Sequence, residues 1–183
     1  MPSLFPVPEL TVPTTDLHPE WLDAHREWAG THQDGSGLGP GDDVASATGF
    51  ADYVARLLRE ASEDEPPPPG RVPCTYWWIT EGRVVLGAVA LRHTLNDFLL
   101  EAGGHVGYSV RPSARRRGLA GWALGEVLRR ASRTGIDPVL ITCDVDNVAS
   151  RRTIESHGGV LDDVRDTTIG RVRRYWIRGA GPA

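Results

Sequence analysis

The first 62 residues contain two segments in which apolar residues recur at helical spacing. The stronger one covers residues 47–62 and follows the i, i+3, i+4, i+7, i+8 rule, with apolar positions Phe50, Tyr53, Val54, Leu57, Leu58 and Ala61. A second helix is predicted from about His18 to Trp28, with Trp21, Leu22, His25 and Trp28 on one face. Residues 66–69 are prolines and predict a stiff connector, because proline lacks the amide proton that a helix requires.

The middle of the chain predicts strands. Val72–Thr80 and Arg83–Arg92 are separated by two residues, which is typical of a tight hairpin. Every position of Val84–Leu91 is apolar, so we expect this strand to be covered on both faces and central in a layered α/β domain. A shorter strand is expected over His105–Val110, because apolar and polar residues alternate there and a proline follows.

The last third of the chain alternates between helical and strand patterns. Helices are predicted from Gly118 to Gly135 and over Val148–His157. Strands are predicted over Pro138–Cys143, Gly159–Val164 and Val172–Ile177. The order of these elements predicts one α/β domain, and 183 residues are enough for a substantial core.

Composition narrows the class of protein. Apolar residues make up 40% of the chain and charged residues 24%, which is the range of ordinary globular proteins. The longest apolar run is far shorter than the ~20 residues that span a bilayer, and the proline-containing start lacks a secretory pattern. Cys74 and Cys143 are far apart and have no partner at metal-binding spacing. We therefore expect a cytoplasmic protein with no membrane partner, no disulfide and no metal.

The charge is distributed unevenly along the chain. Residues 1–110 carry 6 Arg against 16 Asp and Glu, whereas residues 111–183 carry 14 Arg against 8, and there is no Lys. The overall charge of -4 argues against a nucleic-acid partner, while the basic half predicts a site for a smaller anion. Two interpretations of the acidic half stay open: its carboxylates attract a cationic ligand, or they are dispersed over solvated surfaces.

The basic half contains a strand, a turn with three consecutive arginines, and the start of a helix. Arg115, Arg116 and Arg117 precede Gly118, and a helix N-terminus presents free backbone N–H groups and a partial positive charge. Such a turn is suited to phosphate, and three arginines favour a diphosphate. The alternative is a surface loop with solvated arginines. The patterns of nucleoside-triphosphate and dinucleotide phosphate loops are absent from the sequence.

Two motifs in this half resemble those of the GNAT N-acetyltransferase superfamily. Arg115-x-x-Gly118-x-Ala120 is similar to the family's Q/R-x-x-G-x-G/A signature and also lies between a strand and a helix. The segment after the next strand, Asn147-x-x-Ser150-x-x-x-Ile154-x-x-x-Gly158-Gly159, is similar to the second family motif. The resemblance covers about residues 70–180 and implies a mixed, mostly antiparallel central sheet flanked by helices.

The resemblance implies acetyl-CoA as cosubstrate, with no metal. The turn would hold its pyrophosphate, the backbone of Val110 would pair with the pantetheine arm, and the second helix would approach the cosubstrate. The implied binding residues are Val110, Arg115, Arg116, Arg117, Gly118, Leu119, Ala120, Asn147 and Ser150. Two simpler interpretations remain open, because Asn147 is also a good helix N-cap and Gly158 a good C-cap residue.

The two motifs do not specify which residues transfer protons. Many family members have a tyrosine at the position of Ile154, and isoleucine cannot protonate a leaving thiolate, so Tyr108 and Tyr175 are candidate substitutes. His105, whose ordinary pKa is near ~6.5, and Glu101 are candidate bases for the amine. The alternatives are a hydrogen-bonded strand histidine and a solvated glutamate. A backbone N–H would polarise the thioester.

The resulting hypothesis is an acetyl-CoA-dependent N-acetyltransferase whose acceptor is a primary amine on a protein or small molecule. Residues 1–70 would form the acceptor side and residues 71–180 the core with the acetyl-CoA site, within one domain covering 1–183. The acidic half favours a cationic amine. The alternative is a regulatory module that binds CoA with little or no turnover. A homodimer stays open.

Overall fold

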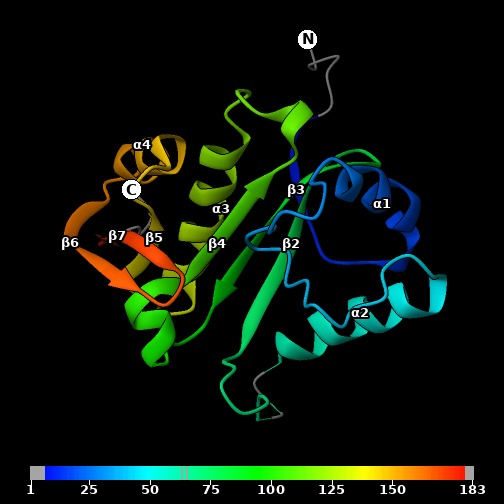
Figure 1. The fold of residues 1–183 in the computed structure, drawn as a ribbon, viewed down its shortest axis with the longest axis horizontal. Coiled ribbons are helices and arrows are strands. Elements are labelled where there is room, and N and C mark those ends of the chain that lie inside the picture. The colour runs from blue at the N-terminus through cyan, green and yellow to red at the C-terminus, as the bar shows by residue number, and fades with distance from the viewer. Residues whose placement is uncertain (1–6, 63, 65, 180–183) are drawn as a thin grey trace.

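The computed structural model describes residues 7–62, 64 and 66–179 and contains two antiparallel sheets (Figure 1). The four-stranded sheet has the order β1-β2-β3-β4. Its strands are β1 (Glu9–Thr11), β2 (Cys74–Glu81), β3 (Val84–Arg92) and β4 (Val106–Val110). The three-stranded sheet has the order β5-β7-β6, formed by β5 (Val139–Asp144), β6 (Val160–Thr167) and β7 (Gly170–Ile177).

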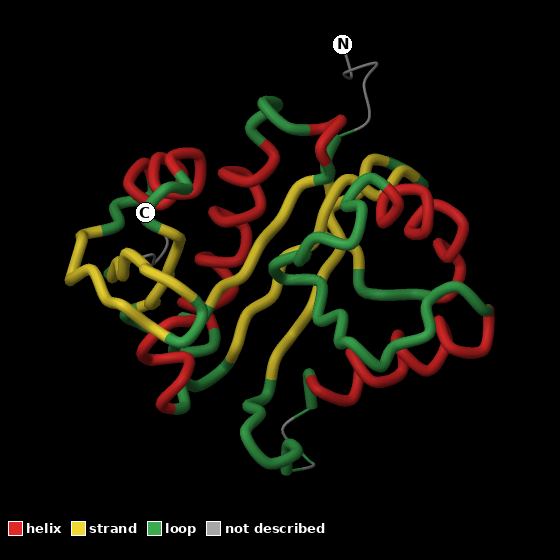
Figure 2. Tube along the Cα trace, viewed as in Figure 1, coloured by secondary structure: helices red, strands yellow, loops and turns green. Residues whose placement is uncertain are grey.

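Four α-helices flank these sheets: α1 (His18–Arg26), α2 (Ala47–Glu60), α3 (Leu119–Arg133) and α4 (Val148–Ser156). Short 3₁₀ turns lie at Thr15–Leu17 and Pro112–Ala114, and a π-helical turn lies at Leu99–Gly103. Figure 1 shows α1 and α2 on one side of the four-stranded sheet and α3 on the other. The long loop between α1 and α2 crosses the face of this sheet (Figure 2).

The two faces of the four-stranded sheet carry separate apolar clusters, and β3 contributes to both. On the α1 and α2 face, Trp21, Phe50, Tyr53 and Trp78 pack with alternate β3 residues such as Ala88. On the α3 face, the cluster includes Ile79, Leu86, Val89, Leu124, Val127 and Ile141. Because successive strand residues point to opposite faces, a strand covered on both sides must be apolar throughout. The prediction of a central strand is therefore confirmed.

The predicted helices and strands are confirmed, with ends that differ by a few residues. Within α2, Phe50, Tyr53, Val54 and Leu57 are buried, whereas Leu58, which the sequence also placed on the apolar stripe, is 46% exposed. The strand β1 was not predicted, because three residues between prolines give no alternating pattern. Its pairing partner β2, with Leu10 opposite Ile79, lies about 70 residues away in sequence.

The two sheets meet where β4 and β5 begin. The backbone N–H of His105 donates to the carbonyl of Leu140 over 2.7 Å. Within the described residues no further backbone bond joins these strands, and each pairs on its other side, β4 with β3 and β5 with β7. The edges of β4 and β5 that face each other are therefore unpaired toward their C-terminal ends.

Candidate active site

The basic turn lies at the C-terminal end of β4 and leads directly into α3. Gly118 is the residue before the helix and has φ 78°, a left-handed conformation that glycine adopts without strain. The backbone N–H groups of residues 116–121 donate to no described protein acceptor; Trp122 is the first residue of the helix to do so, to the carbonyl of Gly118. Six N–H groups without a described acceptor at the start of a 15-residue helix are suited to binding an anion.

The three arginines of the turn have different surroundings. Arg117 forms an ion pair with Glu81 at 2.7 Å. Arg115 donates to the carbonyl of Val110 and lies over the ring of Trp28, 5.5 Å from its centroid. Arg116, with φ 63°, is exposed and has no ion pair in the described part of the chain. The sequence pattern does not distinguish the three, whereas in the fold only Arg117 is paired with a carboxylate, and among the described contacts only Arg116 has no side-chain hydrogen bond, ion pair or ring contact.

The base of the turn is fixed by Arg111, which is buried between β4 and α1. Its guanidinium donates to Glu27 over 2.8 Å, to Asp23 over 2.8 Å and to the carbonyl of Val85 over 3.2 Å. Glu27 also accepts hydrogen bonds from the backbone and hydroxyl of Ser113. These bonds to Arg111 and Ser113 lower the pKa of Glu27 from 4.5 to about 2. The turn is therefore held in place by α1.

This pKa predicts how stability depends on pH. As the pH falls, Glu27 is protonated at a higher pH in the unfolded chain than in the folded protein. The stabilisation that ionised Glu27 gives to the folded state is therefore lost as the pH falls from 4.5 toward 2. We expect Glu27→Gln to flatten the pH dependence in this range, measured by urea unfolding. Asp52→Asn is the control, since Asp52 is exposed on α2 and has no described ion pair. An unchanged pH profile for Glu27→Gln would contradict the assignment.

The backbone of β4 presents donors to the side where β5 diverges. Arg111 donates to Leu86 of β3, and Arg92 of β3 donates to His105, so the odd-numbered residues of β4 form the bonded pairs with β3. In an antiparallel ladder the residues between bonded pairs direct their N–H and C=O groups the other way. The N–H groups of Tyr108 and Val110 therefore point away from β3.

The Tyr108 hydroxyl lies next to the start of α4. It is 2.7 Å from the hydroxyl of Ser150, and Asn147 caps the helix by accepting the N–H of Ser150 over 3.0 Å. Burial raises the pKa of Tyr108 to about 12, with smaller contributions from Cys143 and Asp34. The hydroxyl thus stays protonated at neutral pH. The N-cap interpretation of Asn147 is confirmed, and its contact with a cosubstrate stays a prediction.

Ile154, at the position where many family members have a tyrosine, and the other candidate donor, Tyr175, lie in the core. Ile154 is fully buried in the cluster on the α3 face. Tyr175 is 1% exposed, and its hydroxyl is directed to Glu155 at 3.3 Å. Gly158, with φ 80°, follows the last residues of α4, as its C-cap interpretation predicts. Both hydroxyls contact α4, but only that of Tyr108 lies at the start of the helix, against Ser150, one of the binding residues implied by the second motif.

His105 joins the two sheets. It is 7% exposed, and its Nδ1 accepts the backbone N–H of Leu140 over 2.9 Å, while its backbone N–H donates to the carbonyl of Leu140. Burial, together with the nearby charge of Arg92, lowers its pKa to about 4. A neutral imidazole with Nδ1 engaged is a poor base for an ammonium group. The geometry favours the alternative, a hydrogen-bonded strand histidine.

Glu101 lies on the π-helical turn before β4 and is exposed. Its charge acts on Arg165 of β6. Glu101 and His105 therefore lie toward the beginning of β4, whereas the basic turn follows its end (Figure 1). The structure does not bring Glu101 to the basic turn or to the Tyr108–Ser150 pair.

This placement predicts that His105→Ala affects stability rather than proton transfer. Loss of Nδ1 leaves the buried N–H of Leu140 without an acceptor, which we expect to cost about 1–3 kcal/mol of unfolding free energy. The shape of the pH profile of turnover near neutrality should not change. Urea unfolding and kcat/KM across the neutral range measure the two effects, and loss of an ionisation from the pH profile would restore His105 as the base.

The loop between α1 and α2 contributes residues that sequence reasoning missed. Gly35 is buried against β4, and a Cβ at this position would lie 2.3 Å from the carbonyl oxygen of Gly107. The exposed carboxylate of Asp34 acts on the pKa of Tyr108 and pairs with His32 at 3.2 Å. The cluster of glycines at 35, 37 and 39 was the available signal, because close backbone contacts often require glycine.

Many carboxylates of the acidic half are paired with arginines. The pairs are Glu20–Arg83, Asp23–Arg111, Glu27–Arg111, Asp42–Arg56, Glu60–Arg56 and Glu81–Arg117. Three of these pairs connect the acidic half to the basic half. Part of the charge asymmetry along the sequence is therefore neutralised by contacts between the two halves, and neither of the two interpretations of the acidic half describes these residues.

Other features of the described residues lie away from this region. A cavity of about 350 Å³ lies at the opposite end of α3 from the basic turn, lined by residues that include Trp77, His93, Arg130 and Arg133. No group of three or more His, Cys, Asp or Glu side chains in the described ranges could hold a metal ion. None of the described helices is both long and apolar enough to cross a membrane.

Residues 43–160 match the family model described as the acetyltransferase (GNAT) domain. The chain therefore belongs to the GNAT acetyltransferase family, which confirms the resemblance, the fold class and the class of enzyme. None of the curated protein sequences matches the chain.

Several solved structures share the fold at low sequence identity. The ribosomal L7/L12 alpha-N-protein acetyltransferase RimL, in complex with coenzyme A, is 16% identical with a TM-score of 0.70, over 96% of this chain and 95% of that one. Mycobacterium smegmatis RimJ, in complex with CoA-disulfide, is 16% identical with a TM-score of 0.72, over 95% and 83%. The microcin C7 self-immunity acetyltransferase MccE, in complex with acetyl-CoA and AMP, is 14% identical with a TM-score of 0.68, over 94% and 92%.

Proposed function

We propose that this protein transfers the acetyl group of acetyl-CoA to the nitrogen of a primary amine on a protein or a small molecule. The observation that carries the proposal is the row of free N–H groups from 116 to 121 at the start of α3. These donors are suited to a pyrophosphate, and they lie in a fold that is shared with structures solved with CoA or acetyl-CoA. A phosphate-bearing acyl donor therefore fits the residues present.

Specific groups of this chain would hold the cosubstrate. The six N–H groups, with Arg116, bind the pyrophosphate, and Arg115 and Arg117 add positive charge to the same turn. Gly118 permits the left-handed turn, while Leu119 and Ala120 contribute their backbone N–H groups. The backbone N–H of Val110 pairs with the pantetheine arm, since it points away from β3. Asn147 and Ser150 approach from the start of α4.

Catalysis rests on orientation and on hydrogen bonds from β4. When bound, acetyl-CoA supplies an acetyl group activated as a thioester. The N–H groups of Tyr108 and Val110 are the candidates to polarise the thioester carbonyl. The Tyr108 hydroxyl, held by Ser150, donates a hydrogen bond to the leaving sulfur. Because the pKa of Tyr108 is raised to about 12, the hydroxyl keeps its proton at neutral pH and remains a donor.

Residues 1–70 would form the acceptor side, with the loop between α1 and α2 against β4. Asp34 is exposed on this loop, its charge acts on Tyr108, and it would attract the ammonium group of the acceptor. RimL is described as an alpha-N-protein acetyltransferase, which supports a protein N-terminal amine as one of the acceptors to test. We also propose a cytoplasmic location, and a homodimer stays a prediction.

The decisive experiment measures free thiol released from acetyl-CoA with a panel of amines. The panel contains a peptide with a free N-terminal serine, spermidine, kanamycin and phenethylamine, and mass spectrometry identifies the acetylated product. We expect one class of amine to stimulate thiol release and to gain an acetyl group. Tight acetyl-CoA binding without transfer to any amine, peptide or small molecule would support the regulatory module instead.

A further inference from the structure

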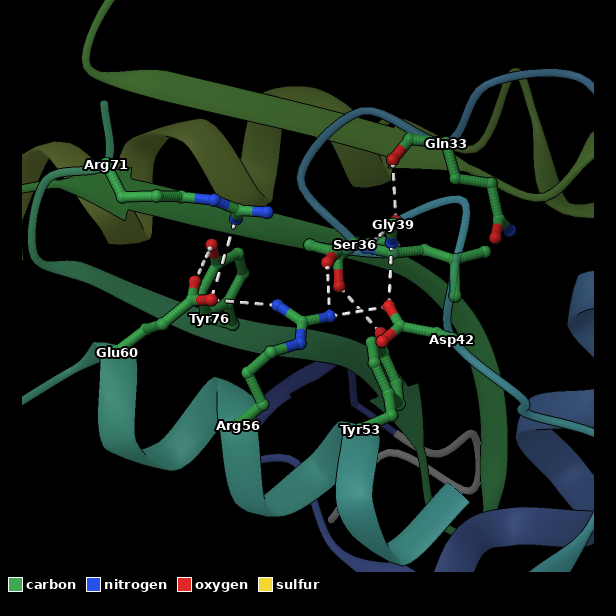
Figure 3. Close-up of polar contacts among 11 residues, drawn as sticks. Gln33, Ser36, Gly39, Asp42, Tyr53, Arg56, Glu60, Arg71 and Tyr76 are labelled. Atoms are coloured by element: carbon green, nitrogen blue, oxygen red, sulfur yellow. Dashed lines mark hydrogen bonds and ion pairs between the residues drawn. The ribbon is translucent and has the colours of Figure 1, made fainter. Parts of the chain in front are cut away.

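The loop between α1 and α2 is held by a network of polar side chains from α2 (Figure 3). Arg56 is at its centre and donates to the carbonyl of Gly37 over 2.9 Å and to Asp42 over 2.6 Å. On its other side the guanidinium donates to Glu60, one helical turn along α2, over 2.8 Å. Asp42 also accepts the backbone N–H of Gly39 over 2.7 Å. One guanidinium thus fixes both arms of the loop.

The neighbours of Arg56 are also held by hydrogen bonds. Glu60 accepts the hydroxyl of Tyr76 over 2.7 Å, and Arg71 lies 3.5 Å from its other oxygen. The hydroxyl of Tyr53 donates to the carbonyl of Ser36 over 2.6 Å. The side chain of Arg56 is 24% exposed and that of Glu60 9% exposed, so these charge-assisted bonds are partly shielded from water.

The network acts on the residues that reach β4. Tyr53 and Arg56 hold the carbonyls of Ser36 and Gly37, which follow Gly35 directly in the chain. Gly35 packs on Gly107, the neighbour of Tyr108, and Asp34, which precedes Gly35, is exposed and acts on Tyr108 through its charge. A movement of residues 36 and 37 would therefore displace Gly35 and Asp34 relative to the Tyr108 hydroxyl. None of the bonds in this network involves the basic turn.

We propose that Arg56 is a positioning residue for the amine acceptor: it clamps residues 33–42 against β4 and so sets the affinity for the acceptor. This inference rests on the proposed function and deepens it. Arg56 acts through the loop, so binding of acetyl-CoA at the start of α3 should not depend on it. This role requires a guanidinium, whose N–H groups lie in one plane and point in several directions. The single ammonium group of a lysine cannot bond to Gly37, Asp42 and Glu60 with the same geometry.

The test compares variants that cut the clamp with one that does not. Arg56→Met removes the guanidinium, and Asp42→Asn removes the charge on the loop while an amide oxygen can still accept from Gly39. Arg71→Met is the matched control, because Arg71 contacts Glu60 but not the loop. We expect Arg56→Met to raise the KM for the most active amine of the panel about tenfold, with a smaller rise for Asp42→Asn and for Arg56→Lys.

Two further measurements separate positioning from loss of structure. In Arg56→Met, the affinity for acetyl-CoA, measured by calorimetry, should stay within a few-fold of that of the unmodified protein, and so should kcat. Hydrogen exchange should become faster in residues 33–42 but not in residues 116–121. If Arg56→Met weakens the binding of acetyl-CoA as much as that of the acceptor, or if hydrogen exchange in residues 33–42 is unchanged, the proposal is overturned. The exchange measurement requires no acceptor. Absence of transfer by the unmodified protein would reject the proposed function, whereas an active protein with an unchanged acceptor KM in Arg56→Met rejects only the clamp.

Discussion

Gly118→Asp is expected to abolish binding of acetyl-CoA while the protein still folds. The new carboxylate would stand among the free N–H groups at the start of α3, where we place the pyrophosphate. Two unit charges about 4 Å apart at an effective dielectric constant of about 20 repel by about 4 kcal/mol. The affinity should therefore fall by about a thousandfold. Calorimetric titration with acetyl-CoA measures this directly.

The matched control is Gly118→Asn, which has nearly the same shape and no charge. Asparagine tolerates the left-handed conformation better than most residues, and a Cβ at Gly118 meets no atom within 4 Å. We expect the Asn variant to keep its affinity within about tenfold and both variants to fold. A folded Gly118→Asp variant that binds acetyl-CoA as tightly as the unmodified protein would place the phosphate site elsewhere.

Tyr108→Phe is expected to lower kcat by about ten- to a hundredfold while the KM for acetyl-CoA changes little. The substitution removes the hydroxyl that lies 2.7 Å from Ser150 and keeps the ring that fills the same space. It therefore deletes the proposed hydrogen bond to the leaving sulfur and leaves the phosphate site intact. Steady-state kinetics with the most active amine of the panel give both parameters.

Tyr175→Phe is the control for this experiment, because it removes the other tyrosine hydroxyl proposed from sequence. That hydroxyl is directed to Glu155 over 3.3 Å and lies in the core. We expect kcat close to that of the unmodified enzyme. If the two variants lose activity equally, the effect is one of packing and Tyr108 is not the donor. Since the pKa of Tyr108 is about 12, its ionisation should not affect the pH profile near neutrality.

The sequence determined those helices and strands that are defined by the spacing of residues close together in the chain. The apolar stripe of α2 and the uninterrupted apolar run of β3 follow from the spacing of neighbouring residues, and both elements are confirmed. The basic turn was also found from sequence, because Gly118 and the start of α3 are consecutive in the chain. The strand β1 was missed because pairing with β2, rather than its own pattern, defines it.

The tertiary structure alone decided which side chains are available for chemistry. Arg117 is paired with Glu81 and Arg116 is not, although the two are adjacent in sequence. Burial lowers the pKa of His105 to about 4, and its Nδ1 accepts a hydrogen bond from Leu140, whereas its ordinary pKa had made it a candidate base. The sequence proposed Tyr108 and Tyr175 as equivalent candidates for the proton donor. In the fold their hydroxyls have different partners: that of Tyr108 contacts Ser150 and that of Tyr175 contacts Glu155.

The physical reason is the distance along the chain over which each effect acts. Helix and strand periodicity repeat within a few residues, so they can be recognised in a short window. Ion pairing, burial and pKa depend on groups that folding brings together, as with Arg111 and Glu27, which are 84 residues apart. The sequence therefore determined the family, the main elements and the basic turn, while long-range contacts decided the surroundings of Tyr108, of the arginines of the turn and of the loop between α1 and α2.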